Sequence, residues 1–495
     1  MSRRKKLFLF THVSNLRNIT GAEKLLLFLA KRFSAHFDCT LVAPQEGRLT
    51  YLARKAGLMT MIRDAPLLYG MCSPYENLTR DAEEMMRGKE AAHVIKLLTE
   101  QRPDVVFVNT SVNIVPAMAA KSLGIPVVWH ITEFVADNPY TEQATQLIER
   151  HSDLIIGISE TTLLPFRKGE SGDKLGLLFP SWDGGDIHPK LWPQLRQSKR
   201  REWGIRPGET VVGYISSFLI AQKGPEHFIQ AALEVARGYP EVRFVIIGGE
   251  VDREFYRSLR RKAAEATGRP IVFINHEESI EAAYSAMDIT VIPSLVSEGF
   301  GMTAMEAMFF GKPVIAYASG GLQEIFNATG NDAYLVKTGE TPELAAKISE
   351  LLASPETMKL VGESNRVQVE SAFGPAAYMG RFLEMVRRVD GLVPSPENDL
   401  QSVNESPGDS SISGTPIPVA VDSALSPIVV RRRSRLRMKK ANKKLSRLRS
   451  ARKKGRSKSI RKRRLRSLRR AAVTKARAQR RKGRGRLASA RRSRR

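Results

Sequence analysis

Two glutamates flank a Gly-Phe-Gly turn in the segment SEGFGMTAMEAM, residues 297–308. Glu298 lies in the turn, and Glu306 falls about one turn into a helix predicted to begin at Gly301 or Met302. A carboxylate accepts two hydrogen bonds at once, which suits the vicinal hydroxyls of a ribose or a hexose. Free N–H groups at a helix start bind phosphate, and glycines let the backbone approach a ligand closely. The segment is therefore suited to hold a sugar, a diphosphate and a ribose together, although acids near a helix start also simply favour the helix dipole.

The elements that position this segment alternate between short apolar runs and helical patterns. Runs such as KLFLFTHV, DVVFVNTS, TVVGYISS and DITVIPS are apolar on both faces, as strands of a parallel sheet covered by helices on both sides are. The alternation pauses in a Trp-, Pro- and Gly-rich stretch and then restarts, which places a boundary near residues 181–205. The sequence thus predicts an α/β protein with two doubly wound, Rossmann-like domains. Ligands of such sheets bind at the carboxyl ends of the strands, and SEGFG follows DITVIP closely.

Four segments follow from these patterns and from the composition. We predict an N-terminal Rossmann-like domain over 1–190 and a C-terminal one over 191–390, which ends in a helix at about 375–390. Residues 391–430 contain six prolines, five acids and no lysine or arginine, which predicts a disordered acidic linker. Residues 431–495 are predicted to form an Arg/Lys-rich low-complexity tail.

The net charge of +28 belongs to the tail rather than to the two domains. The tail holds 34 of the 79 Lys and Arg residues and no acid, whereas residues 1–390 hold 45 basic and 46 acidic residues. Such a tail binds anionic polymers or anionic membrane surfaces without sequence specificity. Nucleic acid is an alternative, non-specific partner, because the tail lacks the aromatic residues that stack on bases.

Few features bear on the cellular compartment. The two cysteines, Cys39 and Cys72, form no pattern typical of a disulfide framework. The basic N-terminus precedes only four apolar residues, LFLF, which is too short for the core of a signal peptide, and no run approaches the roughly 18 apolar residues of a membrane span. The sequence therefore predicts a cytoplasmic protein, with peripheral attachment to the inner face of a membrane or to an anionic assembly as an alternative mediated by the tail.

Residues 289–325, ITVIPSLVSEGFGMTAMEAMFFGKPVIAYASGGLQEI, resemble the signature of retaining, nucleotide-sugar-dependent glycosyltransferases of family 4. The similarity extends over most of residues 6–390 and implies the GT-B fold, in which two Rossmann-like domains face a cleft. It implies that residues 1–190 form the acceptor-side domain, that residues 191–390 bind the nucleotide sugar, and that the helix at about 375–390 crosses back to the first domain. It implies transfer of a hexose from a nucleoside-diphosphate sugar to an acceptor hydroxyl with retained anomeric configuration, in bacterial glycan or cell-surface polysaccharide synthesis. The acceptor stays open between a glycan, a lipid-linked and a small-molecule hydroxyl. No metal or other cofactor is expected, since the sequence has no Asp-x-Asp pair at a strand end and no His/Cys metal spacing.

The resemblance also implies roles for individual residues. Glu306 would hold the donor ribose, and Glu298 would contact the transferred sugar. Lys223, in the motif AQKGPEH, would pair with the diphosphate. His130, in WHITEF, would lie beside the reacting carbon, so that His130 and Glu298 are the predicted catalytic residues. The other donor-binding positions that the resemblance implies are Gly21, His276, Phe300, Gly301, Met302, Thr303 and Glu324.

Three positions depart from the family pattern. Phe218 stands where many members carry an arginine that grips phosphate, Thr20 replaces the first glycine of Gly-Gly-Ala-Glu, and Asn275 stands where glycine is usual. Phe218 motivates an alternative hypothesis, a catalytically weak or inactive GT-B scaffold that binds glycans or, through its tail, polyanions. Hydrolysis or transfer of a nucleotide sugar distinguishes the two hypotheses.

Overall fold

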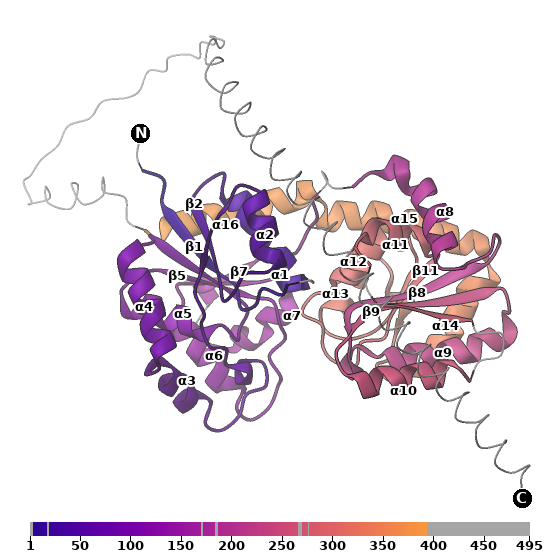
Figure 1. The fold of residues 1–495 in the computed structure, drawn as a ribbon, viewed down its shortest axis with the longest axis horizontal. Coiled ribbons are helices and arrows are strands. Elements are labelled where there is room, and N and C mark those ends of the chain that lie inside the picture. The colour runs from indigo at the N-terminus through magenta and orange to yellow at the C-terminus, as the bar shows by residue number, and fades with distance from the viewer. Residues whose placement is uncertain are drawn as a thin grey trace, which may run out of the picture. The chain divides into compact units, whose positions relative to one another are not determined.

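The computed structural model describes residues 3–16, 19–169, 172–183, 187–265, 270–275 and 277–393. The predicted linker beyond Val393 and the predicted basic tail lie outside these residues, as does His276. The described residues form two lobes, each built on one parallel sheet (Figure 1). The prediction of an α/β protein with two doubly wound domains is confirmed.

The first lobe contains a parallel sheet in the order β3-β2-β1-β4-β5-β6-β7. Its strands are β1 Lys6–Phe10, β2 Asp38–Ala43, β3 Met59–Ile62, β4 Val105–Asn109, β5 Val127–Ile131, β6 Leu154–Gly157 and β7 Leu175–Leu177. Its helices are α1 Gly21–Phe33, α2 Arg48–Lys55, α3 Leu78–Met86, α4 Lys89–Gln101, α5 Ile114–Ser122, α6 Thr141–Arg150 and the short α7 Glu160–Leu163.

The second lobe repeats this architecture with the sheet order β10-β9-β8-β11-β12-β13. Its strands are β8 Thr210–Leu219, β9 Val242–Glu250, β10 Ile271–Ile274, β11 Ile289–Ile292, β12 Val314–Tyr317 and β13 Leu335–Val336. Its helices are α8 Trp192–Glu202, α9 Pro225–Gly238, α10 Arg253–Ala263, α11 Ile280–Ala286, α12 Met302–Phe309, α13 Gly321–Ala328, α14 Thr341–Ala353 and α15 Pro355–Phe373.

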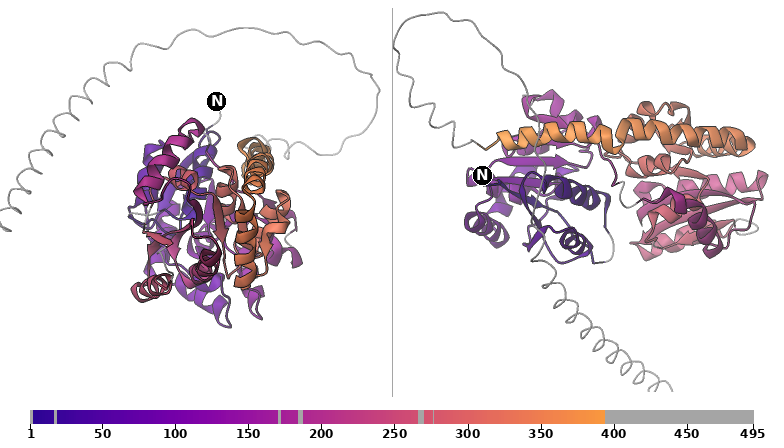
Figure 2. Two further views of the ribbon diagram at one scale, coloured as in Figure 1. Left: turned by 90° about the vertical axis from the view of Figure 1, so that its right-hand side faces the viewer. Right: turned by 90° about the horizontal axis from the view of Figure 1, so that it is seen from above.

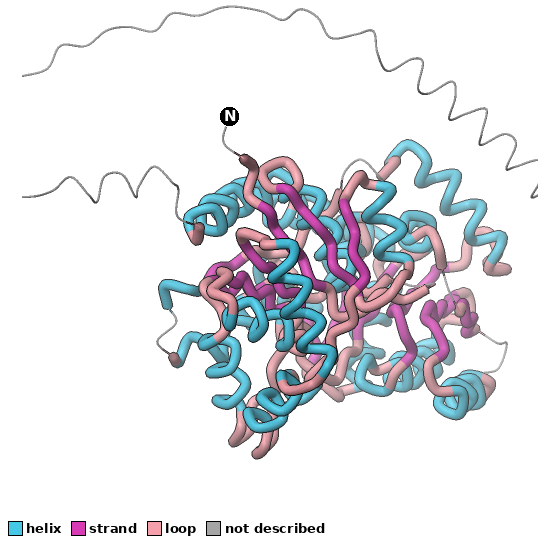
Figure 3. The backbone as a smooth tube through the Cα atoms, turned by 60° about the vertical axis from the view of Figure 1, so that its left-hand side comes forward, coloured by secondary structure: helices cyan, strands magenta, loops and turns pink. Residues whose placement is uncertain are grey.

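Each sheet is covered by helices on both faces, as Figure 3 shows for the strands in magenta and the helices in cyan. Successive side chains of a strand point to opposite faces. Leu7 and Leu9 of β1 pack with α1 and α2 in one core, whereas Phe8 and Phe10 pack with α4 and α5 in another. All four side chains are at most 3% exposed. The strands are therefore apolar on both faces because both faces are buried.

The last helix, α16 Pro375–Gly391, follows α15 directly but packs on the first lobe (Figure 2). Tyr378 and Phe382 are buried in the core of that lobe, where the ring of Phe382 lies 5.0 Å from the ring of Phe33 and that of Tyr378 lies 5.0 Å from that of Phe28. The chain thus crosses from the second lobe back to the first, and the apolar face of α16 holds this crossing in place.

In both sheets the strand order reverses beside the first strand, between β1 and β4 in the first lobe and between β8 and β11 in the second. Loops on the two sides of such a reversal diverge and leave a crevice at the carboxyl ends of the strands. The segment after β11, which contains Glu298, lies at the reversal of the second sheet. This topology provides the position of the site described below.

We predict that Phe382→Ala lowers the free energy of unfolding by about 3–5 kcal/mol, because it removes a buried aromatic ring and leaves a cavity. Leu383→Ala, on the same helix but 43% exposed, is the matched control and should change stability by about 1 kcal/mol or less. Chemical denaturation measures both. Equal losses for the two variants would contradict the packing of α16 on the first lobe.

Candidate functional site

Two neighbouring cavities, of about 410 and 300 Å³, lie between the carboxyl ends of the two sheets. The two cavities adjoin and share part of their walls. The residues that line both are Gly21, Ile215, Ser216, Ser217, Met302 and Thr303. Because Gly21 belongs to the first lobe and the others to the second, the two cavities are bounded by both lobes, which belong to one compact unit of the chain.

The loop from Ser294 to Gly301 connects β11 to α12 and lines the smaller cavity. Gly301 is the N-cap of α12 and has φ +109°, a conformation that favours glycine, and an added Cβ would also press on Leu322. The ring of Phe300 is 2% exposed and packs 5.3 Å from the ring of Phe373. Phe300 therefore anchors the loop through its side chain and leaves its backbone to face the cavity.

Glu298 and Lys223 form an ion pair on the wall of the smaller cavity. The Lys223 ammonium donates to both carboxylate oxygens of Glu298 at 2.7 Å. Lys223 comes directly before Gly224, which has φ +67° and lies so close to the carbonyl of Pro293 that a Cβ would overlap it. This glycine brings the end of β8 against the end of β11, and so places the ammonium beside the carboxylate.

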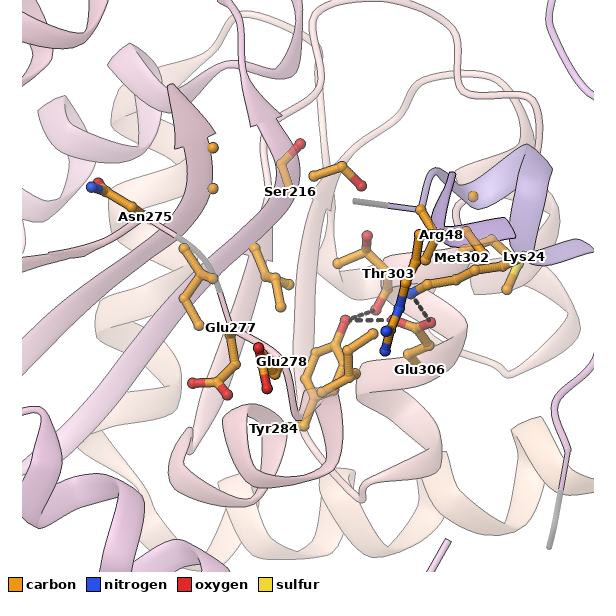
Figure 4. A pocket seen from close by; sticks show the side chains of 18 of the residues that line it. Lys24, Arg48, Ser216, Asn275, Glu277, Glu278, Tyr284, Met302, Thr303 and Glu306 are labelled. Atoms are coloured by element: carbon orange, nitrogen blue, oxygen red, sulfur yellow. Dashed lines mark hydrogen bonds and ion pairs between the residues drawn. The ribbon is translucent and has the colours of Figure 1, made fainter. Parts of the chain in front are cut away.

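Glu306 lies on the wall of the larger cavity, in the second turn of α12. The hydroxyl of Tyr284 donates to Oε2 of Glu306 at 3.1 Å, and Nζ of Lys24 lies 3.9 Å from Oε1 (Figure 4). Lys24 belongs to α1 of the first lobe, so this ion pair spans the two lobes. The two glutamates of the predicted motif therefore line two adjoining cavities.

Ser216 and Ser217 line both cavities because β8 is irregular at this point. The register between β8 and β9 shifts between Ile215 and Phe218, as in a β-bulge. Such irregularities redirect side chains at functional sites. Ser216 donates to the carbonyl of Phe218 at 3.0 Å, and Phe218 itself lines the smaller cavity. The position at which the family usually carries arginine thus contributes an apolar ring to the wall.

His130 lies inside the first lobe rather than on the wall of either cavity. It is 1% exposed at the end of β5, and its Nδ1 lies 2.8 Å from Oδ1 of Asn109. Burial lowers the pKa of His130 to about 3, so that the imidazole is neutral at physiological pH. Thr132, two residues further along the chain, lines the smaller cavity instead. His130 was expected beside the reacting carbon, on the wall of the site. It lies inside the lobe instead, because side chains alternate in direction along β5 and that of His130 points inward.

Glu324 also differs from its expected position in the donor site, because its carboxylate binds the first lobe. It accepts hydrogen bonds from the backbone N–H groups of Glu160 and Thr161 at 2.8 and 2.7 Å, and from the Thr161 hydroxyl. Glu324 does not line the described walls of the two cavities. Nearby, the hydroxyl of Ser159 donates to the carbonyl of Gly299. Glu324 therefore joins the first turn of α13 to the start of α7 and connects the lobes.

Thr20 explains one departure from the family pattern. It is the N-cap of α1, and it forms a capping box in which its hydroxyl accepts from the backbone N–H of Glu23 and its own N–H donates to the Glu23 carboxylate at 2.8 Å. Burial raises the pKa of Glu23. The box fixes the start of α1, where Gly21 lines both cavities.

Several wall residues carry no motif in the sequence. Asn275 lines the larger cavity, and the next residue in the sequence, His276, lies outside the described residues. Tyr284 contributes a hydroxyl to the same wall. From the first lobe come Lys24, one residue after the capping box, and Arg48, the first residue of α2. The capping box could have indicated Lys24, whereas only the fold brings Arg48 to the cavity.

Residues 196–368 match the family described as Glycosyl transferases group 1. The matched residues all lie in the second lobe. The chain is 30% identical over 201 residues to the D-inositol 3-phosphate glycosyltransferase of Nocardia farcinica, covering 39% of this chain and 43% of the relative. It is 28% identical over 226 residues to the enzyme of the same name from Segniliparus rotundus, covering 45% and 46%. The chain thus spans about half the length of the curated relatives it matches.

The whole described architecture has solved counterparts. The structure of Anabaena Alr3699/HepE in complex with UDP-glucose superimposes with a TM-score of 0.64 and 20% sequence identity, covering 78% of this chain and 100% of that one. Similarity at this level establishes the GT-B fold. Within the described ranges, no group of three or more His, Cys, Asp or Glu side chains is arranged to hold a metal ion. No helix among the described residues is long and apolar enough to cross a membrane.

We predict that Glu324→Ala lowers the free energy of unfolding by about 1–3 kcal/mol, because the first turn of α7 loses a charged hydrogen-bond acceptor. Gln323→Ala, at the exposed neighbouring position of the same helix, is the control. Denaturation with urea measures both, and indistinguishable curves would contradict the assigned connection between the lobes.

We predict that His130 makes stability depend on pH below about 6.5. The folded-state pKa is about 3 and the unfolded value 6.5, so the unfolded chain binds the proton and stability falls as the pH decreases through this interval. The loss of unfolding free energy between pH 7 and 5 should be about 2 kcal/mol smaller in His130→Gln than in the wild type. Denaturation at the two pH values measures this difference, and parallel losses would contradict the burial of a neutral imidazole.

Proposed function

We propose that the protein is a retaining hexosyltransferase of family 4 that transfers a hexose from a nucleoside-diphosphate sugar to an acceptor hydroxyl, in bacterial glycan or cell-surface polysaccharide synthesis. The observation that carries the proposal is that Lys223, Glu298, Glu306 and the start of α12 line two adjoining cavities between two Rossmann-like lobes. The carboxylates suit the hydroxyls of a sugar and a ribose, and the ammonium and the helix start suit a diphosphate. The group 1 domain and the UDP-glucose in the HepE structure support a nucleotide-sugar donor.

The proposed donor lies with its diphosphate at the start of α12. Backbone N–H groups at Gly301 to Thr303 and the ammonium of Lys223 would bind the phosphate oxygens. Glu306 would accept hydrogen bonds from the two ribose hydroxyls, with Tyr284 holding its carboxylate in place. The hexose would then lie in the smaller cavity beside Glu298 and Gly21.

The proposed chemical step exchanges one carbon–oxygen bond for another. The bond from the anomeric carbon to the diphosphate oxygen breaks, and the acceptor oxygen forms the new bond on the same face of the sugar. The proton of the acceptor hydroxyl passes to the departing phosphate oxygen. Positive charge on the helix start and on Lys223 stabilises the negative charge that develops on the leaving group. His130, which is buried and neutral, would act as a positioning residue through the adjacent strand end.

The ion pair between Lys223 and Glu298 gives the donor site a defined charge before the donor binds. Both oxygens of Glu298 hold the ammonium at 2.7 Å, so the lysine is already oriented toward the cavity. A diphosphate would share this ammonium, and the released carboxylate oxygen could accept a hydrogen bond from a sugar hydroxyl. Such preorganisation reduces the reorganisation needed during reaction.

One observation, the residue at position 218, favours the alternative function. This alternative is an inactive GT-B scaffold that binds glycans or, through its tail, polyanions. Phe218 places an aromatic ring on the cavity wall where an arginine is usual in the family, which removes one positive charge from the phosphate site. A scaffold of this kind would bind ligands without turning over a nucleotide sugar. Measuring hydrolysis or transfer with UDP-, GDP- and ADP-sugars separates the two functions.

We predict that thermal shift with these nucleotide sugars identifies a stabilising donor, and that Glu306→Ala then lowers kcat/KM by about 100-fold or more. The reason is the loss of two hydrogen bonds between a charged acceptor and the ribose. Glu343→Ala, at an exposed position of α14, is the control for removing a carboxylate elsewhere. Unchanged transfer by Glu306→Ala would refute the role of this residue, and a stabilising donor without any turnover would favour the scaffold.

A further inference from the structure

The phosphate site proposed above has few positive charges on its own lobe. Among the described wall residues of the two cavities, the second lobe contributes one cation, Lys223, and both oxygens of Glu298 lie 2.7 Å from it. Phe218 occupies the position at which many members of the family that the sequence resembles carry an arginine. A diphosphate carries at least two negative charges, so the second lobe alone leaves part of this charge uncompensated.

The first lobe supplies two cations to the same space. Lys24 and Arg48 both line the larger cavity, and Figure 4 shows their side chains beside Glu306 and Thr303. Nζ of Lys24 lies 3.9 Å from a carboxylate oxygen of Glu306, a distance at which the ammonium remains available to a second anion. The Arg48 guanidinium lies 5.5 Å from the centre of the Tyr51 ring, and no ion pair among the described residues includes it.

The backbones that carry these cations are held in place. The N–H of Arg48 donates to the carbonyl of Asn15 at 2.7 Å, and Gly47 packs so closely on Ser14 that a Cβ would overlap it. This contact fixes the start of α2 on the loop after β1. Lys24 follows the capping box that fixes the start of α1. These contacts fix the backbone from which the two side chains extend, Lys24 being half-buried and Arg48 exposed.

We propose that Lys24 and Arg48 bind the phosphate groups of the nucleotide from across the cleft and replace the arginine that is missing at position 218. This inference rests on the proposed function and assigns to the first lobe a share of donor binding. The ligand class is a nucleoside diphosphate, because Lys24 and Arg48 lie next to Thr303 and Glu306, where the proposed ribose and phosphates meet. Binding of the diphosphate then requires both lobes, so the donor itself holds the cleft closed.

A simpler role for Lys24 is to neutralise Glu306, and ligand affinities distinguish this role from phosphate binding. If Lys24 only neutralises Glu306, its removal changes the grip on the ribose, and the affinities for a nucleoside and for its diphosphate change by the same factor. If Lys24 and Arg48 bind phosphate, only the phosphorylated ligands lose affinity. The comparison of uridine, UMP and UDP, or of the corresponding series for the base that thermal shift selects, separates these roles.

The experiment is isothermal titration of the full chain at physiological salt with this series of ligands. We expect Lys24→Met and Arg48→Met each to weaken UDP binding about tenfold or more, with little change for uridine, because each loses a charge-assisted hydrogen bond to phosphate. Arg48→Lys retains the charge and should recover part of the affinity. Lys55→Met, at an exposed position near the end of the same helix α2, is the matched control for loss of one positive charge.

Three outcomes overturn the inference. In the first, the wild type binds UDP and the Lys24→Met and Arg48→Met variants bind it equally well. This result would exclude phosphate binding by the first lobe and leave the proposed function intact. Equal losses for uridine and UDP would assign Lys24 and Arg48 to the ribose instead. A wild-type protein that binds no nucleotide of any base would refute the proposed function itself, and the inference with it.

Discussion

The site depends on a close backbone contact that only glycine permits. Gly320 and Gly321 lie against the backbone of Glu298 and Phe300, and the N–H of Gly321 donates to the carbonyl of Glu298 at 2.8 Å. On the other side, Gly299 approaches the carbonyl of Thr132 in the first lobe so closely that a Cβ would overlap it. The loop is therefore clamped between α13 and the other lobe. This contact determines where Glu298 stands, where α12 begins and which way Glu306 faces.

The same contact explains why the connections between the lobes cluster near the loop from Ser294 to Gly301. Glu324 is four residues after Gly320 and binds the start of α7, while the hydroxyl of Ser159, the N-cap of α7, donates to the carbonyl of Gly299. A movement of one lobe relative to the other would pass through these bonds to the backbone of the loop. The geometry of this loop and the contact between the lobes therefore depend on each other.

Charge is distributed over the cavity in pairs that a donor would rearrange. Lys223 pairs with Glu298 and Lys24 approaches Glu306, so that each carboxylate of the motif already faces a cation. Such pairs at partly exposed positions contribute little to stability. Their consequence is orientation, because each polar group points into the space where a ligand with both hydroxyl and phosphate groups fits. Phe218, which is apolar, supplies no charge to this wall. The charge available to a phosphate therefore depends on where the remaining cations lie.

Features that leave a local pattern in the sequence could be predicted, and features that depend on contacts between distant residues could not. Strands that are buried on both faces, and glycines that have no sterically acceptable substitute, leave local patterns, so the fold and the loop from Glu298 to Glu306 were accessible from the sequence. The inward direction of His130 was not, because it depends on the side-chain alternation of β5 within the finished sheet. The attachment of Glu324 to α7 was also hidden, since it joins residues more than 160 positions apart.

The sequence by itself determined two doubly wound lobes and an acidic, glycine-flanked segment at a strand end, because alternation and backbone conformation are local properties of the chain. Only the tertiary structure decided which side chains share a cavity. Lys24 and Arg48 reach the space opposite Thr303 because α1 and α2 begin at the edge of the first sheet that faces the second. Contacts of this kind depend on packing between distant segments, which no local pattern encodes.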